Sequence, residues 1–399
     1  MRSRDLTTTV AVTERSVKSL LVVVPPPSGA GVSPATIVAG LPLLRRIVLA
    51  GIRAGFTRVL VRSAHAGIEP LLDGTPATAL TEGGNPGPAA RTRIVILPGN
   101  VVPQARWLRM LRERPIEMER LHGDPSAAAV IDTEDAAAVL AAGARCESAE
   151  ELVAALRAQF GGAELEGDAA GRFRLSSPAD TARAETWLLR SLIKQREGFM
   201  SRHFERKISL AITRRLAATR VTPDAMTLVS LALGLLGATF FLSSAPRYQL
   251  IGALLFLTHS ILDGCDGELA RLKFMESPHG ALLDFWGDNL VHVSVFTCMS
   301  VGLSLAIGAA WPLLIGALTV AATVGSAACA SRQTMRDTAL GDDASWAARL
   351  AEAFSHRDFI YLVVVLSAFG KAHWFLMLAS VGTPIFFLLI LWVSARRRA

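Results

Sequence analysis

Four aspartates stand close together in the most apolar half of the sequence: Asp263, Asp266, Asp284 and Asp288. An ionisable side chain in a membrane-like segment is costly to bury and by default indicates a functional site. Carboxylate oxygens are the ligands that hard divalent cations prefer, and Mg²⁺ usually combines them with phosphate oxygens of a substrate. These residue types therefore indicate a site for a divalent cation.

The spacing of the aspartates predicts two helices that aim them at one place. At about 100° per residue, Asp263 and Asp266 fall on one side of a first helix. Asp284 and Asp288 are four residues apart, so they stack on one face of a second helix. A short segment before Pro278 would join the two helices. We therefore expect all four carboxylates to converge.

Small residues and one arginine accompany the aspartates. Gly267, Ala270 and Gly280 share the helix faces of the aspartates and carry little or no side chain. A ligand can approach the backbone closely at such positions. Arg271 supplies a permanent positive charge that suits a phosphate. These residues predict a phosphate-bearing ligand beside the cation.

The whole stretch, from Asp263 to Asp288, reads D-x2-D-G-x2-A-R-x8-G-x3-D-x3-D. This pattern resembles that of the CDP-alcohol phosphotransferase family, and each of its eight specified positions is met. The resemblance covers roughly residues 195–395. It implies a six-helix membrane enzyme that transfers a substituted phosphate from a CDP-alcohol donor to a hydroxyl acceptor and releases CMP.

The resemblance also implies roles for single residues. Asp263, Asp266 and Asp284 would hold the metal, which is Mg²⁺ or Mn²⁺. Asp288 would contribute to the metal site and act as the base on the acceptor hydroxyl. The residues that would border the CDP are Gly267, Ala270, Arg271, Gly280 and Thr227.

Other interpretations of the acidic cluster remain open at this point. The carboxylates could pair with Arg271 and hold helices together, or line an ion path, as intramembrane charges do in transporters. A transporter with a cation site would bind a divalent metal without releasing CMP. An inactive structural homologue is a third reading, and the complete set of carboxylates argues against it.

The distribution of charge divides the chain into a polar half and an apolar half. Most charges lie in residues 1–220 and the long apolar runs lie in 225–395. The net charge of +7 comes from Arg and Lys that flank apolar segments, so we expect anionic lipid headgroups as partners and no nucleic acid. The four cysteines are widely spaced, which argues against a disulfide framework or a zinc site. Residues 1–15 lack the apolar core of a secretory signal, so we expect the first half to be cytoplasmic.

The polar half alternates strand and helix patterns, which predicts an α/β domain. We expect strands at 18–24, 57–62 and 94–97, with a fourth beginning at 130–131. Helical patterns are expected at 42–54, 134–142 and 149–159. The expected organisation of the chain is a tail at 1–16, the α/β domain at 17–184, a basic junction helix at 185–221 and a membrane domain at 222–399.

The α/β domain resembles the nucleotidyltransferase fold of sugar-nucleotide and inositol-phosphate cytidylyltransferases, with its best match at 38–61. That family places an Arg and a Lys in the loop after the first strand. Here the loop at 25–34 keeps Gly29 and Gly31, lacks both cations and is rich in proline, which removes backbone N–H donors. A clear metal-binding Asp after the third strand is absent, and Asn100 stands near its expected place. We therefore expect a degenerate relative without cytidylyltransferase activity that acts as a scaffold, a regulatory module or a dimerisation module of a homodimer.

The junction at 185–221 is rich in Arg and Lys. Phe204, Ile208, Ala211 and Ile212 recur at helical spacing with basic residues opposite, which predicts an amphipathic helix on the inner leaflet.

Six apolar spans follow, at about 226–244, 249–268, 282–305, 309–330, 358–370 and 374–394. Arginines and lysines gather at alternate span ends, so we expect both termini and the carboxylates on the cytoplasmic side of the inner membrane.

Fusion of these two domains resembles the bifunctional inositol-phosphate cytidylyltransferase and di-inositol-phosphate-phosphate synthase, which implies an inositol-phosphate-like substrate. A phospholipid synthase that uses CDP-diacylglycerol is the alternative.

Overall fold

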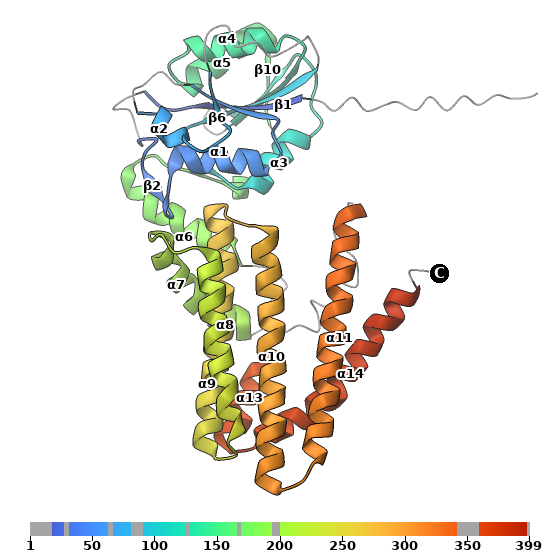
Figure 1. Ribbon diagram of the computed structural model, residues 1–399. Helices are drawn as coiled ribbons and strands as arrows, with labels where there is room; N and C mark the ends of the chain where they lie inside the picture. The colour runs from blue at the N-terminus through green and yellow to red at the C-terminus, as the bar shows by residue number, and fades with distance from the viewer. Residues whose placement is uncertain are drawn as a thin grey trace, which may run out of the picture. The chain divides into compact units, whose positions relative to one another are not determined.

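The computed structural model describes residues 18–27, 32–62, 67–80, 91–124, 128–165, 169–193, 200–340 and 359–396 (Figure 1). The chain forms two compact units, Met1–Leu188 and Leu189–Ala399. The first is an α/β unit and the second is helical, so the predicted fold class is confirmed in both halves.

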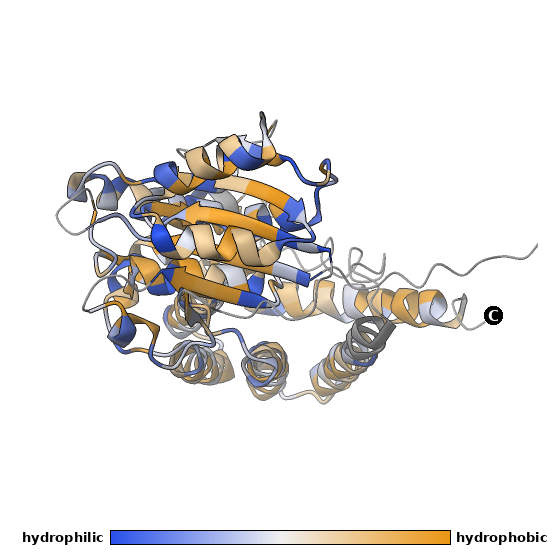
Figure 2. Cartoon of the chain, turned by 90° about the horizontal axis from the view of Figure 1, so that it is seen from above, coloured by the Kyte–Doolittle hydropathy of each residue, from blue (hydrophilic) through white to orange (hydrophobic). Residues whose placement is uncertain are grey.

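A seven-stranded sheet forms the centre of the first unit, in the order β10-β8-β9-β6-β1-β4-β5. The strands are β1 (Lys18–Val24), β4 (Arg58–Arg62), β5 (Thr78–Leu80), β6 (Thr92–Pro98), β8 (Leu121–Asp124), β9 (Ala128–Thr133) and β10 (Gly162–Ala163). β1 pairs in parallel with β4 and β6, whereas β9 runs antiparallel to β6 and β8. The central strands are apolar along most of their length, as Figure 2 shows, because helices cover the sheet on both faces.

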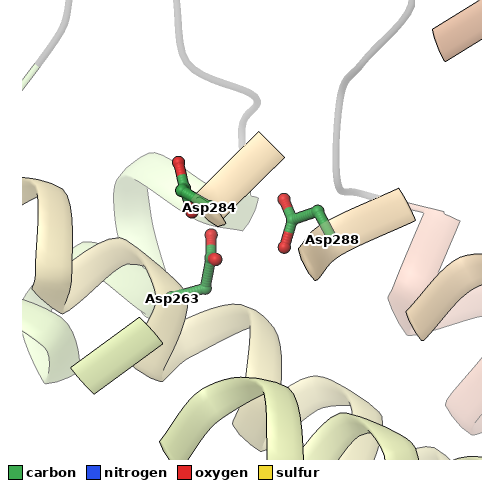
Figure 3. Close-up of side chains that lie close together, drawn as sticks. All are labelled: Asp263, Asp284 and Asp288. Carbon is green, nitrogen blue, oxygen red and sulfur yellow. The ribbon is translucent and has the colours of Figure 1, made fainter. Parts of the chain in front are cut away.

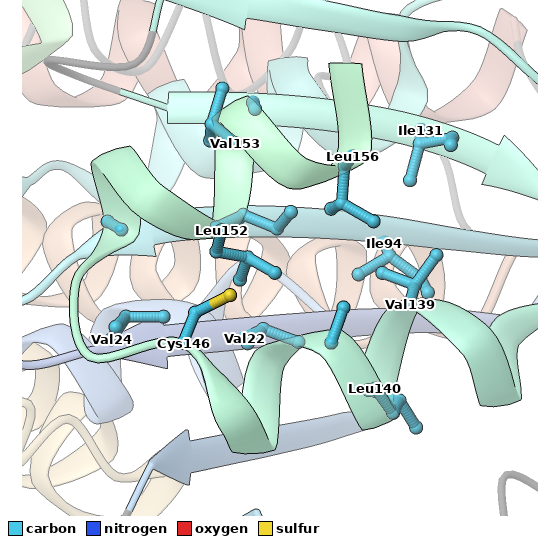
Figure 4. Close-up of a cluster of buried hydrophobic side chains, with 14 of the residues drawn as sticks. Val22, Val24, Ile94, Ile131, Val139, Leu140, Cys146, Leu152, Val153 and Leu156 are labelled. Atoms are coloured by element: carbon cyan, nitrogen blue, oxygen red, sulfur yellow. The ribbon is translucent and has the colours of Figure 1, made fainter. Parts of the chain in front are cut away.

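Helices α4 (Ala136–Arg145) and α5 (Ala149–Phe160) cover one face of the sheet and enclose an apolar core (Figure 4). Leu152 and Leu156 of α5 are fully buried against strand residues such as Val22 and Ile94. Alternate residues of β1 point to the other face, where Leu21 lies next to Gly51 of α1 (Leu43–Arg53). The period-two alternation of a strand thus supplies apolar side chains to two layers.

Smaller elements complete this unit: β2 (Ile37–Val38), β3 (Leu41–Pro42), α2 (Glu69–Leu72), β7 (Val101–Pro103), α3 (Ala105–Glu113), β11 (Arg172–Arg174) and α6 (Thr181–Ser191). The expected strands and helices are all present, and the strand expected from 130–131 is β9. The antiparallel direction of β9, helix α3 and strands β5, β8 and β10 were not predicted. The side chain of Asn100 donates to the backbone carbonyl of Leu175 at 3.1 Å. Gly29 and Gly31 lie outside the described residues, so the predicted degenerate loop stays a prediction.

The second unit is built from helices α7 (Arg206–Ala217), α8 (Pro223–Thr239), α9 (Pro246–Lys273), α10 (Pro278–Ile307), α11 (Trp311–Leu340), α13 (Phe359–Ala368) and α14 (Ala372–Arg396). Five helical segments within the described residues are long and apolar enough to cross a membrane. They are Pro223–Leu242, Pro246–Lys273, Pro278–Ile307, Trp311–Arg332 and Ala372–Ala395.

The span predicted at 358–370 corresponds to α13, of which the structure describes 10 residues, directly after the undescribed residues 341–358. At about 1.5 Å per residue such a helix is roughly 15 Å long, half the thickness of a bilayer core. Six spans were predicted, whereas the described part of the chain contains five helices of spanning length. Residues 358–370 are apolar as expected, but the 10 described residues of α13 are too few to span by themselves.

The core of this unit lies where α8, α9 and α10 meet α13 and α14. Phe256 of α9, Val291 of α10 and Val363 of α13 are almost completely buried there. Close approach of α8 and α9 depends on glycine, since a Cβ on Gly237 would lie 3.1 Å from the carbonyl of Gly252. This packing fixes the relative rotation of the helices that carry the four aspartates.

Helix α7 buries polar residues and exposes apolar ones. Ser209 and Thr213 are buried against α9, whereas Phe204, before α7, and Ile208 are exposed. The exposed apolar side is consistent with the predicted amphipathic helix. The buried polar side was not predicted.

Candidate functional site

A tight connection brings the two acidic helices together. Helix α9 ends at Lys273, and Phe274 adopts a left-handed conformation with φ of 58°. Helix α10 begins at Pro278 after Ser277, whose hydroxyl accepts the backbone N–H of Gly280 at 2.9 Å. This N-cap satisfies an amide that has no partner within the helix. The end of α9 therefore leads directly into the first turn of α10.

Three of the four aspartates form a compact cluster (Figure 3). Asp263 of α9 and Asp284 and Asp288 of α10 each offer a carboxylate oxygen, and these oxygens lie within 4.8 Å of one another. Asp263 is buried. The Oδ1 atom of Asp284 is buried and has no hydrogen-bond partner among the described residues. The side chains point toward one another from two helices, as the spacing predicted.

The donor set of this cluster fits a hard divalent cation. Like charges at such short range destabilise one another, and a buried polar atom without a partner carries a further cost. A divalent cation coordinated by carboxylate oxygens would remove both costs, and oxygen is the donor that Mg²⁺ and Mn²⁺ prefer.

The fourth aspartate, Asp266, lies beside the cluster. Its Oδ2 accepts a hydrogen bond from the hydroxyl of Thr227 on α8, and its Oδ1 accepts one from the backbone N–H of Gly267. It is buried at the floor of a pocket that also reaches Asp284. Asp266 therefore connects the acidic cluster to the pocket.

This pocket has a volume of about 190 Å³ and opens between the ends of α8, α9 and α10. All five residues that were expected to border the CDP line it, namely Thr227, Gly267, Ala270, Arg271 and Gly280. A Cβ on Gly280 would lie 3.0 Å from Asp224 Oδ1 and 3.0 Å from Ser277 Oγ. A larger residue at 280 would thus fill part of the pocket.

The structure adds residues that the motif did not include. His259 of α9 is buried, and its Nε2 lies 3.5 Å from Asp288 Oδ1. His259 precedes Asp263 by four residues, so helical spacing alone could have placed it on the same face. Asp224, Glu276 and Ser277 also line the pocket. The family pattern specifies none of these three positions.

Glu268, an unspecified position of the motif, holds α7 against α9. Its carboxylate is fully buried and accepts hydrogen bonds from Arg206 Nη1 at 2.6 Å, Ser209 Oγ at 2.7 Å and Thr213 Oγ1 at 2.6 Å. These bonds explain the buried polar side of α7. They also fix the position of α9 on the side away from Thr227.

Known proteins resemble part of the chain. A bifunctional IPC transferase and DIPP synthase of Rubrobacter xylanophilus is 39% identical over 172 residues, which are 42% of this chain and 38% of that protein. The protein of the same description from Thermococcus kodakarensis is 35% identical over 134 residues, covering 33% of this chain and 30% of that protein. The matches thus span well under half of these relatives.

Solved structures also match. Phosphatidylinositol phosphate synthase of Mycobacterium tuberculosis with CDP-DAG bound is 21% identical, with a TM-score of 0.33, and covers 47% of this chain and 94% of that chain. The same protein in complex with manganese and citrate is 22% identical, with a TM-score of 0.31, and covers 46% of this chain and 88% of that chain.

The family model described as CDP-alcohol phosphatidyltransferase matches residues 220–393. This range contains α8, α9 and α10 with all four aspartates and the whole pocket. The part of the chain that resembles the CDP-alcohol phosphatidyltransferase family, residues 220–393, is thus the part that holds the candidate site.

Proposed function

We propose that this protein is an integral membrane CDP-alcohol phosphotransferase. It transfers a substituted phosphate from a CDP-alcohol to a hydroxyl acceptor and releases CMP. The observation that carries the proposal is the convergence of Asp263, Asp284 and Asp288 beside a pocket lined by the remaining motif residues. The family match over residues 220–393 supports the same reaction class.

Asp263, Asp266, Asp284 and Asp288 are the proposed ligands of Mg²⁺ or Mn²⁺. When bound, the cation would neutralise the diphosphate of the donor and the charge that develops on the leaving CMP. Three of these carboxylates already lie together, and Asp266, three residues after Asp263 on α9, lines the same pocket as Asp284. This makes one shared metal site the simplest assignment.

The protein's own groups then perform the transfer. Gly267, Ala270 and Gly280 leave room for the nucleotide, and the Arg271 guanidinium pairs with a phosphate. Asp288 accepts the proton of the acceptor hydroxyl. The acceptor oxygen forms a bond to the phosphorus that carries the donor alcohol, and the bond from that phosphorus to the CMP oxygen breaks. CMP leaves with the electron pair of that bond.

We propose an inositol-phosphate-like substrate for this reaction. The relatives from Rubrobacter xylanophilus and Thermococcus kodakarensis are described as IPC transferase and DIPP synthase, and this description supports the proposal. A phospholipid synthase that uses CDP-diacylglycerol shares the chemistry. In that alternative the alcohol attached to the diphosphate of the donor is diacylglycerol.

The proposed location is the cytoplasmic membrane, with the acidic cluster facing the cytosol. The cluster lies near the end of α9 that carries Arg271 and Lys273, and positive residues favour the cytoplasmic side. CDP-alcohols with a polar alcohol are soluble in water and would reach the pocket from that side.

The test is a CMP-release screen of the purified full-length protein. CDP-inositol, CDP-diacylglycerol and CDP-glycerol are offered with candidate acceptors, with Mg²⁺ or with a chelator. We expect Mg²⁺-dependent CMP release from at least one pair, abolished by Asp288→Ala and by Asp266→Ala in folded protein. Divalent metal binding without CMP release from any pair would favour a transporter instead. Full activity of either variant would remove the assignment of these carboxylates.

A further inference from the structure

The two sides of helix α3 in the first unit differ sharply in character. The helix lies beside α1 (Figure 1). Its buried side is apolar and consists of Trp107, Leu108 and Leu111. An open hollow of about 470 Å³ on its other side is lined by Arg106, Arg109, Met110, Glu113 and Arg114. The exposed side of this amphipathic helix is therefore rich in arginine.

Backbone carbonyls hold two of the α3 guanidinium groups in place. Arg109 Nη2 donates to the carbonyl of Arg53 at 3.4 Å, and Arg112 Nη1 donates to the carbonyl of Gly55 at 2.6 Å. Both carbonyls belong to the turn that ends α1. A Cβ on Gly55, whose φ is 84°, would lie 2.0 Å from Arg112 Nη1, so this contact requires glycine. Cations that are held in this way lose less conformational entropy when they bind a ligand.

Positive charge exceeds negative charge on this side of α3. Glu113 is the one acidic residue that lines the hollow in the described part of the chain, and its carboxylate accepts a hydrogen bond from Arg112. Arg106 donates to a neutral oxygen, Gln104 Oε1, at 2.6 Å. A guanidinium group has five N–H donors, so these arginines keep donors for a further acceptor. Phosphate oxygens are the acceptors that suit a group of arginines.

The shape of the hollow favours a surface over a small molecule. A site for a small molecule usually encloses most of its ligand, and an open hollow on one side of a single helix does not. A bilayer surface presents many phosphates side by side and needs no enclosure. Five helices of spanning length in the second unit keep the chain at a bilayer. The effective concentration of lipid headgroups near the first unit is therefore high.

We propose that the basic face of α3, formed by Arg106, Arg109, Arg112 and Arg114, docks the first unit on anionic lipid headgroups. These arginines stand far before the first spanning segment, which begins at Pro223, so they are separate from the cations that flank the spans. The docking requires a membrane but not the transfer reaction, and it therefore goes beyond the proposed function. It gives the α/β unit a role that needs no nucleotidyltransferase activity.

The test uses the full-length protein in nanodiscs of phosphatidylcholine alone or of phosphatidylcholine mixed with phosphatidylglycerol. Hydrogen exchange of peptides from α3 is measured in both. We expect phosphatidylglycerol to slow this exchange by about 10- to 30-fold, since each arginine near an anionic surface contributes roughly a factor of five in affinity. Added salt should remove the slowing, because it screens the attraction.

Two double variants separate the basic face from net charge in general. Arg106→Gln with Arg109→Gln removes two cations from the face. Arg145→Gln with Arg174→Gln removes two exposed cations elsewhere in the same unit: Arg145 ends α4, and Arg174 pairs with Glu150 of α5. We expect the slowing by phosphatidylglycerol to fall below about threefold in the first variant and to persist in the second. Each variant is compared with itself in phosphatidylcholine, so a change in stability does not affect the comparison.

Three results would overturn the proposal. The first is equal exchange of wild-type α3 in the two lipid compositions. The second is an equal loss of the slowing in both double variants, which would show a general effect of charge. The third is slowing by inorganic phosphate in phosphatidylcholine nanodiscs as strong as that by phosphatidylglycerol, which would assign the hollow to a free phosphate compound.

Discussion

At the scale of residues, identity and spacing predict which side chains come together. The motif aspartates stand on two helix faces that meet, and each residue expected to border the nucleotide lines one pocket. Spacing does not predict the partners of each oxygen. Asp266 is engaged by Thr227, and that pair depends on how α8 packs on α9. Spacing places His259 on the same helix face as Asp263, but it does not show where the ring points. That direction depends on the packing of α8 and α10.

The hydroxyl of Thr227 should matter for activity because it orients Asp266. We expect Thr227→Val to lower kcat/KM for the CDP-alcohol by about 10- to 100-fold, as for other groups that support a metal-binding carboxylate. Thr258→Val is the matched control, since the Thr258 hydroxyl only bonds the Leu254 carbonyl of its own helix. The measurement is the kinetics of CMP release. Equal activities of the two variants would show that Asp266 needs no orienting hydroxyl.

At the scale of elements, apolar periodicity predicted the helices but not every surface that they bury. The exposed apolar residues of α7 follow from its sequence. Its buried polar side follows from Glu268, which lies more than fifty residues later in the chain. The full burial of the Glu268 carboxylate is explained by its partners, the Arg206 guanidinium and two hydroxyl groups.

Loss of Glu268 should be costly, because the Arg206 guanidinium and the hydroxyls of Ser209 and Thr213 would lose the carboxylate that they share. We expect Glu268→Ala to destabilise the second unit by about 3–5 kcal/mol. Replacing both partners, as in Arg206→Met with Glu268→Met, should cost less than Glu268→Ala, since both charges of the ion pair are then removed together. Denaturation of the detergent-solubilised protein by SDS measures both. A double variant less stable than the single one would contradict this account of α7.

In the first unit, the ion pairs between β6 and β9 predict a dependence of stability on pH. Burial raises the pKa of the Asp132 carboxyl, but hydrogen bonds and charges from Arg93 and Arg91 outweigh burial and hold the pKa below its usual value. A depressed pKa in the folded state contributes stability above the unfolded-state pKa of about 3.9. That stability is lost as the pH falls through the folded-state pKa.

Hydrogen exchange is measured for peptides of β6 and β9 and corrected for intrinsic exchange rates. It reports on the stability of the first unit separately from that of the second. We expect protection to fall between about pH 6 and about pH 3 in the wild type. Asp132→Asn should be less protected at about pH 6 and should change less with pH, because the titrating group is gone. Unchanged wild-type protection at the lower pH would show that the Asp132 ion pairs contribute little.

At the scale of the whole molecule, composition predicted two halves of different kinds, and both are present. The alternation of strands and helices predicted the sheet, although the antiparallel direction of β9 depends on non-local pairing. The number of spans was less predictable. The apolar run at 358–370 predicted a span, whereas the described part of α13 has 10 helical residues.

Topology tests how α13 takes part in the membrane domain. If the number of crossings is even, with α13 forming part of one crossing, both termini lie on the same side of the membrane. The flanking arginines favour the cytoplasmic side. We expect tags at the N- and C-terminus to be reached by protease only from the cytosolic side in sealed vesicles. Tags on opposite sides would mean an odd number of crossings, with the five long helices spanning and α13 not contributing one.

The central claim is that a divalent cation sits among the carboxylates of α9 and α10. An anomalous-scattering map of the full-length protein crystallised with Mn²⁺ tests it directly. We predict a peak within roughly 2.5 Å of oxygens from Asp263, Asp284 and Asp288. A map whose manganese peaks all lie elsewhere, with these three side chains well ordered, would contradict the account.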